Sequence, residues 1–489
     1  MLMSKKPVRE QDKRRKPNLK VNFAYNLVYQ ILAVALPLVT TPYLSRVLGA
    51  DGLGAYSYTY SIASFFALFI LLGIANHGNR AVAASRNDKD LLSGVFINLY
   101  VIQLFMGVVV IAAYCVFVCL MPGHNAVLQW IWVVYLVSCA LDISWFFFGL
   151  ELFKITVTRN LVIKLLTFVS IFLFVKTKDD VPVYCLLMAI GMLLSQAMLW
   201  PFVKSKIDFV PPTLAGMKEQ ARPLLVLFIP VLAVGIYTMV NKILLGYISG
   251  TEESGFYDNA LKIASVPTLA VTALGTVMLP RISYYAGTGQ LENVKERLQL
   301  SLKIVLGYSF FTFAGFLALA DDFCGLFFGP GFEKCGLLMQ ILGLYVPFFS
   351  WANVLRNQYL IPLKRDSAFV LAVITGAIIS LVLNTVLVPF LGSVGTAIVT
   401  VTSEAVVCVI QTWAVRKDLA WREVLLGCIP FVLFSGLSFV CVKFFCCDEG
   451  SSWLSFLAGI ALYLCCFAVL TGFYLFIKKT RFASDSCRL

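Results

Sequence analysis

Long apolar stretches separated by short polar connections run along nearly the whole chain. Fourteen of them are long enough to cross a membrane, since a transmembrane helix needs about 20 consecutive apolar residues. They lie near 22–48, 53–78, 92–120, 126–149, 153–175, 181–203, 223–249, 253–282, 294–320, 335–361, 367–390, 393–415, 424–445 and 452–477. The pattern predicts an all-α polytopic membrane protein with about 14 transmembrane helices.

The polar connections alternate in charge from one side of the predicted membrane to the other. The first 20 residues carry eight Lys and Arg, and basic residues continue in alternate loops, for example at Arg86 and Lys206. The loops between them are mainly acidic, as at Asp51, Glu252 and Asp321. Because basic loops remain in the cytoplasm and the span number is even, both termini are predicted to be cytoplasmic.

The composition excludes several classes of protein. Hydrophobic residues make up 60% of the 489 residues and charged residues only 13%, whereas soluble domains are nearer half and a quarter. The net charge of +13 arises from the basic loops, so nucleic acid is not an expected partner. We find no phosphate-binding loop for ATP, and no CxxC pair or histidine cluster for a metal, so no cofactor is expected.

An internal repeat divides the chain. The segment from Gly49 to Tyr56 recurs from Gly250 to Tyr257, a shift of 201 positions, and further on Tyr135 matches Tyr345 at a shift of 210. Six spans separate equivalent points, so the halves should be parallel and related by an axis along the membrane normal. The repeat predicts a basic tail over 1–20, lobes over 21–222 and 223–420, and two extra spans over 421–489.

Charged side chains inside the predicted spans are mostly cationic. Each costs about 2.5–3.5 kcal/mol at a helix centre, so it must face a polar interior or a partner. The cations are Arg46, Arg159, Lys164, Lys242, Lys262, Lys303 and Arg356, and the acids are Asp142, Asp258 and Glu404. The surplus of positive charge predicts a bound anion, with Arg159 and Lys164 deep in the fifth span as the leading candidates.

Other interpretations of these charges stay open. Arg46, Lys303 and Arg356 lie near span ends and could extend to lipid headgroups. Asp258 and Lys262, one helical turn apart, could simply neutralise each other. Asp142 and Glu404 are candidates for coupling transport to Na⁺ or H⁺, although Glu404 could equally be a structural hydrogen-bonding group.

Several motifs resemble one family of transporters. The run from Pro42 to Gly49, followed by Gly73-Ile74 and Arg80, resembles the opening of the Wzx-type oligosaccharide flippases of the multidrug/oligosaccharidyl-lipid/polysaccharide exporter superfamily. Further matches are Gly149, Glu151, Arg159, Lys164, Tyr184, Gly255, Tyr257, Lys262, the run Leu279-Pro280-Arg281-Ile282-Ser283, Asn353, Asn384 and Glu404. The likeness covers roughly residues 20–415. One departure is Asn241, where the family often has an acid.

The resemblance implies a fold and an activity. It implies two pseudo-symmetric six-helix lobes around a central cavity, plus two C-terminal helices. The implied function is translocation of an undecaprenyl-pyrophosphate-linked oligosaccharide, or a teichoic acid-type precursor, to the outer leaflet of the bacterial cytoplasmic membrane by alternating access. The expected substrate-binding residues are Arg46, Arg80, Arg159, Lys164, Lys242, Asp258, Lys262 and Arg356.

The expected partners follow from this activity. They are the lipid-linked glycan, membrane lipids, and as a candidate the polymerase or ligase machinery that uses the glycan. A lipid II flippase is an alternative that shares the architecture. A drug or cation antiporter of the same superfamily would need an anionic cavity, and a membrane-embedded enzyme would need a large outer loop, which the pattern does not contain.

Overall fold

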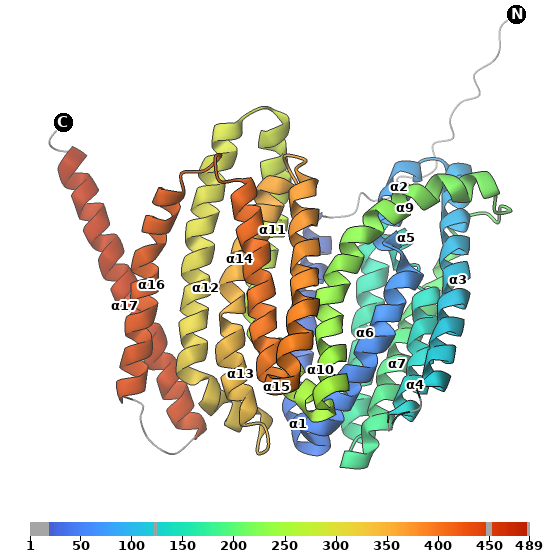
Figure 1. The fold of residues 1–489 in the computed structure, drawn as a ribbon. Coiled ribbons are helices and arrows are strands. Elements are labelled where there is room, and N and C mark those ends of the chain that lie inside the picture. Colours follow the sequence, from blue (N-terminus) through green and yellow to red (C-terminus); the bar gives the residue numbers. More distant parts are fainter. Residues whose placement is uncertain (1–18, 122, 124, 446–451, 487–489) are drawn as a thin grey trace, which may run out of the picture.

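The computed structural model describes residues 19–121, 123, 125–445 and 452–486, and these are almost entirely helical (Figure 1). The predicted basic tail over 1–20 therefore lies outside the described residues except for its last two positions. The helices stand roughly side by side as one broad bundle. Within the described ranges there is no β-strand.

The N-lobe consists of the elements up to residue 203. They are α1 (Leu19–Leu71), α2 (Ile74–Ser85), α3 (Lys89–Leu120), α4 (Ala126–Ala140), α5 (Ser144–Gly149), α6 (Phe153–Phe174), η1 (Lys178–Asp180), α7 (Val181–Ala197) and α8 (Trp200–Val203). Helix α3 begins at a side-chain cap, where the Asp88 carboxylate accepts hydrogen bonds from the backbone N–H groups of Asp90 and Leu91.

The C-lobe and two further helices complete the chain. The C-lobe comprises α9 (Leu214–Gly235), η2 (Ile236–Val240), α10 (Asn241–Ser249), α11 (Thr251–Gly287), α12 (Leu291–Phe328), α13 (Lys334–Gly343), α14 (Tyr345–Leu355), η3 (Arg356–Leu360) and α15 (Asp366–Ala414). Helices α16 (Trp421–Phe445) and α17 (Trp453–Ser486) pack beside α12 at the edge of the bundle (Figure 1).

Twelve described helical stretches are long and apolar enough to cross a membrane. Two of them contain a glycine at which the chain reverses: Gly49 in α1, with φ 72° and ψ −178°, and Gly392 in α15, with φ 54° and ψ −131°. Only glycine adopts such angles without strain. Counting each of these stretches as two crossings gives the predicted fourteen, and the polytopic all-α fold is confirmed.

The turns at Gly49, Gly250 and Gly392, with the loop 329–333, lie at one end of the bundle, which we call the hinge face. The opposite end, where α2 begins and α11 ends, is called the basic face. Gly250 links α10 to α11 with φ 95° and ψ 167°, close to the geometry of Gly49. The repeated motif therefore produces the same interhelical turn in each half.

The two lobes meet at the hinge face through a reciprocal glycine contact. A Cβ atom on Gly54 would lie 1.7 Å from the Thr251 carbonyl oxygen, and one on Gly255 would lie 2.0 Å from the Ala50 carbonyl oxygen. The repeat pairs Gly54 with Gly255 and Ala50 with Thr251, so the contact has approximate two-fold symmetry. Because neither glycine has a side chain, the backbones of α1 and α11 touch directly.

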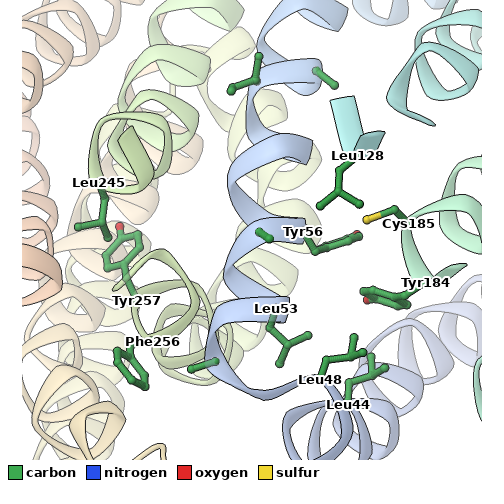
Figure 2. Packing of buried hydrophobic residues seen from close by; sticks show 14 of the residues in the cluster. Leu44, Leu48, Leu53, Tyr56, Leu128, Tyr184, Cys185, Leu245, Phe256 and Tyr257 are labelled. Carbon is green, nitrogen blue, oxygen red and sulfur yellow. The ribbon is translucent and has the colours of Figure 1, made fainter. Parts of the chain in front are cut away.

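Hydrogen bonds reinforce this closed end. The Ser45 hydroxyl donates to the Phe328 carbonyl at 2.7 Å, and the Thr251 hydroxyl donates to the Asp51 carboxylate across the same contact. A hydrophobic core continues from one lobe to the other here. Figure 2 shows Tyr56 and Tyr184 on one side of α1 and Phe256 on the other. The two lobes therefore contact each other closely at the hinge face.

Candidate functional site

A cavity of about 480 Å³ lies within the N-lobe, between α1, α4, α6 and α7. Its size falls in the range of small-ligand pockets. Apolar side chains form much of the wall, but a polar strip crosses it. The polar lining residues are Thr40, Tyr135, Ser138, Asp142, Asn160, Lys164, Thr167, Ser195 and Gln196. We call this space the N-lobe cavity.

Of the two leading candidates from the sequence, one lines this cavity and the other lies behind its wall. Lys164 lines it directly. Arg159, on the same helix α6, is 6% exposed, and its guanidinium donates to Asn160 Oδ1 at 2.7 Å and Gln196 Oε1 at 3.1 Å. Both amides are lining residues, so they hold the guanidinium at the cavity wall. One cation thus lines a cavity within the membrane-spanning region, and a second lies against two of its lining amides.

The acid at this cavity is Asp142, between α4 and α5. Its Oδ1 atom accepts hydrogen bonds from the Ser144 backbone N–H at 2.8 Å and the Ser144 hydroxyl at 2.5 Å. These bonds compensate part of the cost of placing a carboxylate inside the protein. With the buried Arg159 behind the wall included, the charged groups here are two cations and one acid, which favours an anionic ligand over a cationic one.

A second charged group lies where α10 and α11 meet near the hinge face. The Asp258 carboxylate, 4% exposed, forms ion pairs with Lys242 and, at 2.7 Å, with Lys262. Asp258 is also within electrostatic range of Tyr56 and Tyr184 in the N-lobe. We call these three residues the Lys–Asp–Lys triad; it carries a net positive charge beside the contact between the lobes.

The C-lobe interior holds a neutral hydrogen-bonded cluster. The Asn241 side-chain oxygen accepts hydrogen bonds from the Ser380 hydroxyl at 2.6 Å and from the Asn384 amide at 2.8 Å. Nearby, the hydroxyl groups of Tyr257 and Thr400 lie 2.7 Å apart. Asn241, the departure from the family pattern, thus links α10 to α15 through its amide group.

The remaining candidates lie elsewhere. Arg46 is exposed at the hinge face, where its guanidinium donates to the carbonyl oxygens of Pro42 and Leu326, both at 2.8 Å, and so bridges the lobes. Arg80 is exposed on α2 at the basic face. Arg356 and Glu404 lie in the C-lobe. The structure therefore distributes the predicted residues over several places instead of one.

Sequence reasoning missed the neutral residues Asn160, Ser195 and Gln196, because only charged residues were considered inside the spans. A search for amide and hydroxyl groups in the middle of apolar segments would have found them. Among the described residues, His, Cys, Asp and Glu nowhere form a group of three that could hold a metal ion.

The profile of the family described as "Polysaccharide biosynthesis protein" matches residues 19–286, which is more than half of the chain. The chain belongs to this family. The resemblance to Wzx-type flippases that its motifs indicated is therefore confirmed. As a member of the polysaccharide biosynthesis family, the chain is a multi-pass membrane protein.

Individual relatives agree with this assignment. The chain is 23% identical over 410 residues to the "Putative O-antigen transporter" of Escherichia coli (strain K12), covering 82% of this chain and 98% of that protein. It is 26% identical over 215 residues to the "Probable flippase AglR" of Haloferax volcanii, covering 42% of this chain and 45% of that protein.

Solved structures with a similar fold are transporters. The lipid II flippase MurJ in an inward closed conformation superposes with a TM-score of 0.68 at 14% identity, over 92% of this chain and 98% of that chain. A MATE structure in the bent conformation gives 0.51 at 13% identity, over 84% and 95%. At these identities the likeness shows a shared fold.

Proposed function

We propose that this protein is a flippase that moves an undecaprenyl-pyrophosphate-linked oligosaccharide, or a teichoic acid-type precursor, to the outer leaflet of the bacterial cytoplasmic membrane. The observation that carries the proposal is the pair Arg159 and Lys164 at the N-lobe cavity. Family membership and relatives named as transporters and flippases support it. The glycan would then pass to polymerase or ligase machinery.

The chemistry of the cavity suits a phosphate group. Guanidinium and ammonium groups bind phosphate oxygens through charge-assisted hydrogen bonds, which are about twice as strong as neutral ones. The amides that hold the Arg159 guanidinium pre-organise it for such a ligand. A cationic drug would instead meet two like charges, so the arrangement disfavours a drug or cation antiporter.

The orientation follows from the loop charges. Basic loops remain in the cytoplasm, so the basic face is cytoplasmic and the hinge face is external. The structure then corresponds to a state that is closed to the outside, because the lobes touch at Gly54 and Gly255. Alternating access requires that these backbones separate when the glycan is released.

The Lys–Asp–Lys triad lies close to this contact between the lobes. Its carboxylate should hold the two lysines in ion pairs when no ligand is bound. Asp258→Asn should leave the protein inserted, tighten binding of inorganic pyrophosphate, and slow release to the outside, because the carboxylate no longer competes for Lys242 and Lys262. Lys262→Ala should weaken the same binding. Pyrophosphate affinity can be measured by calorimetry on purified protein, with Lys295→Ala as control, which changes a partly buried cation of the basic face that pairs with Glu292.

A purely structural triad would behave differently. Asp258→Asn would then abolish folding, and adding Lys262→Ala would restore it. That pair of results would overturn the proposed role of the triad.

Transport should need no ATP, because the chain has no phosphate-binding loop for it. Vesicles containing only this protein should move a fluorescent undecaprenyl-pyrophosphate oligosaccharide between leaflets, as read by quenching with a membrane-impermeant reagent. Empty vesicles are the control. Transport that occurs only after ATP is added would contradict the proposal. Testing lipid II alongside would show whether the protein serves peptidoglycan synthesis instead.

A further inference from the structure

A second pocket, of about 420 Å³, lies between the two lobes near the hinge face. The N-lobe contributes α1, the end of α3 and the start of α4 to its wall, and the C-lobe contributes α10. The lobes touch within it, because a Cβ atom on Gly246 of α10 would lie 2.3 Å from the Tyr58 ring of α1. We call this space the interlobe pocket; it shares no lining residue with the N-lobe cavity.

Two amide side chains in this pocket are available to a ligand. Gln129 is 8% exposed, and its side-chain carbonyl accepts a hydrogen bond from the Tyr114 hydroxyl. Its Nε2 group has no hydrogen-bond partner among the described residues. Asn125 occupies the N-cap position of α4, where Asn commonly bonds the first backbone N–H groups, but its side chain makes no such bond. Both amides can therefore bond to a molecule in the pocket.

Aromatic side chains form other parts of the wall. Tyr58 and Phe117 are half-buried, whereas Tyr247 is 74% exposed at the rim. A tyrosine ring offers an apolar face together with a hydroxyl group that can donate or accept a hydrogen bond. The pocket thus combines flat apolar surfaces with a few hydrogen-bonding groups, which is typical of sites for small ligands.

The charge of the pocket indicates a neutral ligand. Its lining residues, all from the described part of the chain, include no Lys, Arg, His, Asp or Glu. A phosphate would need cations, and a cationic drug would need an acid. A sugar ring meets the requirements, because its C–H groups form an apolar face that can stack on an aromatic ring. Its hydroxyl groups both donate and accept hydrogen bonds, as amide side chains do.

We propose that the interlobe pocket binds a neutral sugar unit from the external side. The binding itself does not depend on the proposed flippase function, but the identification of the sugar as part of the exported glycan rests on it. Because Tyr58 and Gly246 belong to different lobes, a bound sugar should favour the arrangement in which Gly54 and Gly255 lie at the contact between the lobes. The site would engage the glycan after release, once the hinge face has closed again.

Saturation-transfer NMR on the full chain in lipid nanodiscs tests the binding without a detergent that carries sugar. The probes are the methyl glycosides of glucose, galactose, mannose and N-acetylglucosamine, with dihexanoylphosphatidylcholine as a lipid probe. At least one glycoside should give a saturable signal with wild type. Tyr247→Ala and Gln129→Met should each weaken its binding about two- to tenfold, the loss expected for one stacking contact or one neutral hydrogen bond.

Both variants should fold. Tyr247 is exposed, and in Gln129→Met the Tyr114 hydroxyl keeps its hydrogen bond to the backbone carbonyl of residue 129, at 3.0 Å in wild type. The matched control is Tyr284→Ala, which removes another exposed tyrosine, on α11 at the basic face, and should bind the glycoside as wild type does.

Three results would overturn the proposal. In the first, no glycoside binds to wild type. In the second, Tyr247→Ala and Gln129→Met bind the glycoside as tightly as wild type, so the sugar lies elsewhere. In the third, the lipid probe binds to this pocket and every glycoside fails to displace it, so the site is a lipid site. Flipping of the glycan lipid in vesicles decides the flippase function separately, because it can succeed or fail whatever the glycosides do.

Discussion

A protein carrying both Arg159→Gln and Lys164→Gln should export its glycan at least about 100-fold more slowly than wild type. Hydrogen bonds from charged groups contribute about 1.5–3 kcal/mol each, and about 1.4 kcal/mol corresponds to a factor of ten. Removing two cations from one phosphate site should therefore slow export by a factor of about 100 or more. Glutamine is shorter than arginine or lysine but keeps a neutral hydrogen-bonding group and a good helix former at each position, so α6 should still fold.

The measurement is the amount of surface glycan per molecule of membrane-inserted protein. Lys303→Gln is the matched control, because it removes a cation from α12 that packs against Gly427 of α16, away from the N-lobe cavity. Its export should stay close to that of wild type. Normal export by the Arg159/Lys164 double variant would show that this cavity is not part of the transport path.

Gly54→Ala should hold the external side open and reduce export at least about tenfold. The new methyl group would lie 1.7 Å from the Thr251 carbonyl oxygen, so the lobes cannot close as they do in this structure. A state that opens only outward cannot load substrate from the cytoplasm. Gly255→Ala, with 2.0 Å to the Ala50 carbonyl oxygen, should have the same effect because the contact is reciprocal. Even a few kcal/mol against closure would produce a tenfold population shift.

Chemical labelling can report the opening. Ser45 is 3% exposed and bonds across the lobes to Phe328, so a Ser45→Cys probe should react slowly with an impermeant maleimide in the closed protein. Adding Gly54→Ala should accelerate labelling. Gly94→Ala, where a methyl group meets no heavy atom within 4 Å, is the control and should leave the rate unchanged. Equal labelling rates in the Gly54→Ala and Gly94→Ala backgrounds would show that the glycine contact does not control closure.

Much of the fold follows from patterns that the sequence displays openly. The hydropathy pattern predicts the number of membrane crossings, because each crossing must satisfy its backbone hydrogen bonds within its own apolar helix. The repeat places Gly49 and Gly250 at equivalent turns, which the structure gives nearly the same backbone angles. What the repeat alone does not disclose is that Gly54 packs on Thr251, since this depends on how the two lobes dock.

The candidate site was predictable only in part. Arg159 and Lys164 stand out because charge is expensive inside a membrane helix; Lys164 lines the N-lobe cavity, and Arg159 bonds to one of its lining amides. Asn160 and Gln196 are neutral, so the cost of placing a charge in a membrane helix does not point to them. The hydrogen bond from Arg46 to the Leu326 carbonyl of the C-lobe could not be predicted from the sequence either, since it depends on the distant α12. The short π-helical segments η2 and η3 could not be predicted from the hydrophobic periodicity either, because one inserted residue barely changes an apolar run.

The most direct test of the flippase assignment is to deplete the protein from its own cells and determine the sidedness of the lipid-linked saccharides. One undecaprenyl-pyrophosphate-linked oligosaccharide should then accumulate in the cytoplasmic leaflet while lipid II keeps its normal distribution. Restoring the wild-type protein should clear it, and the Arg159/Lys164 double variant should not. Depletion that leaves every lipid-linked saccharide at its normal level and on its normal side would contradict the flippase assignment.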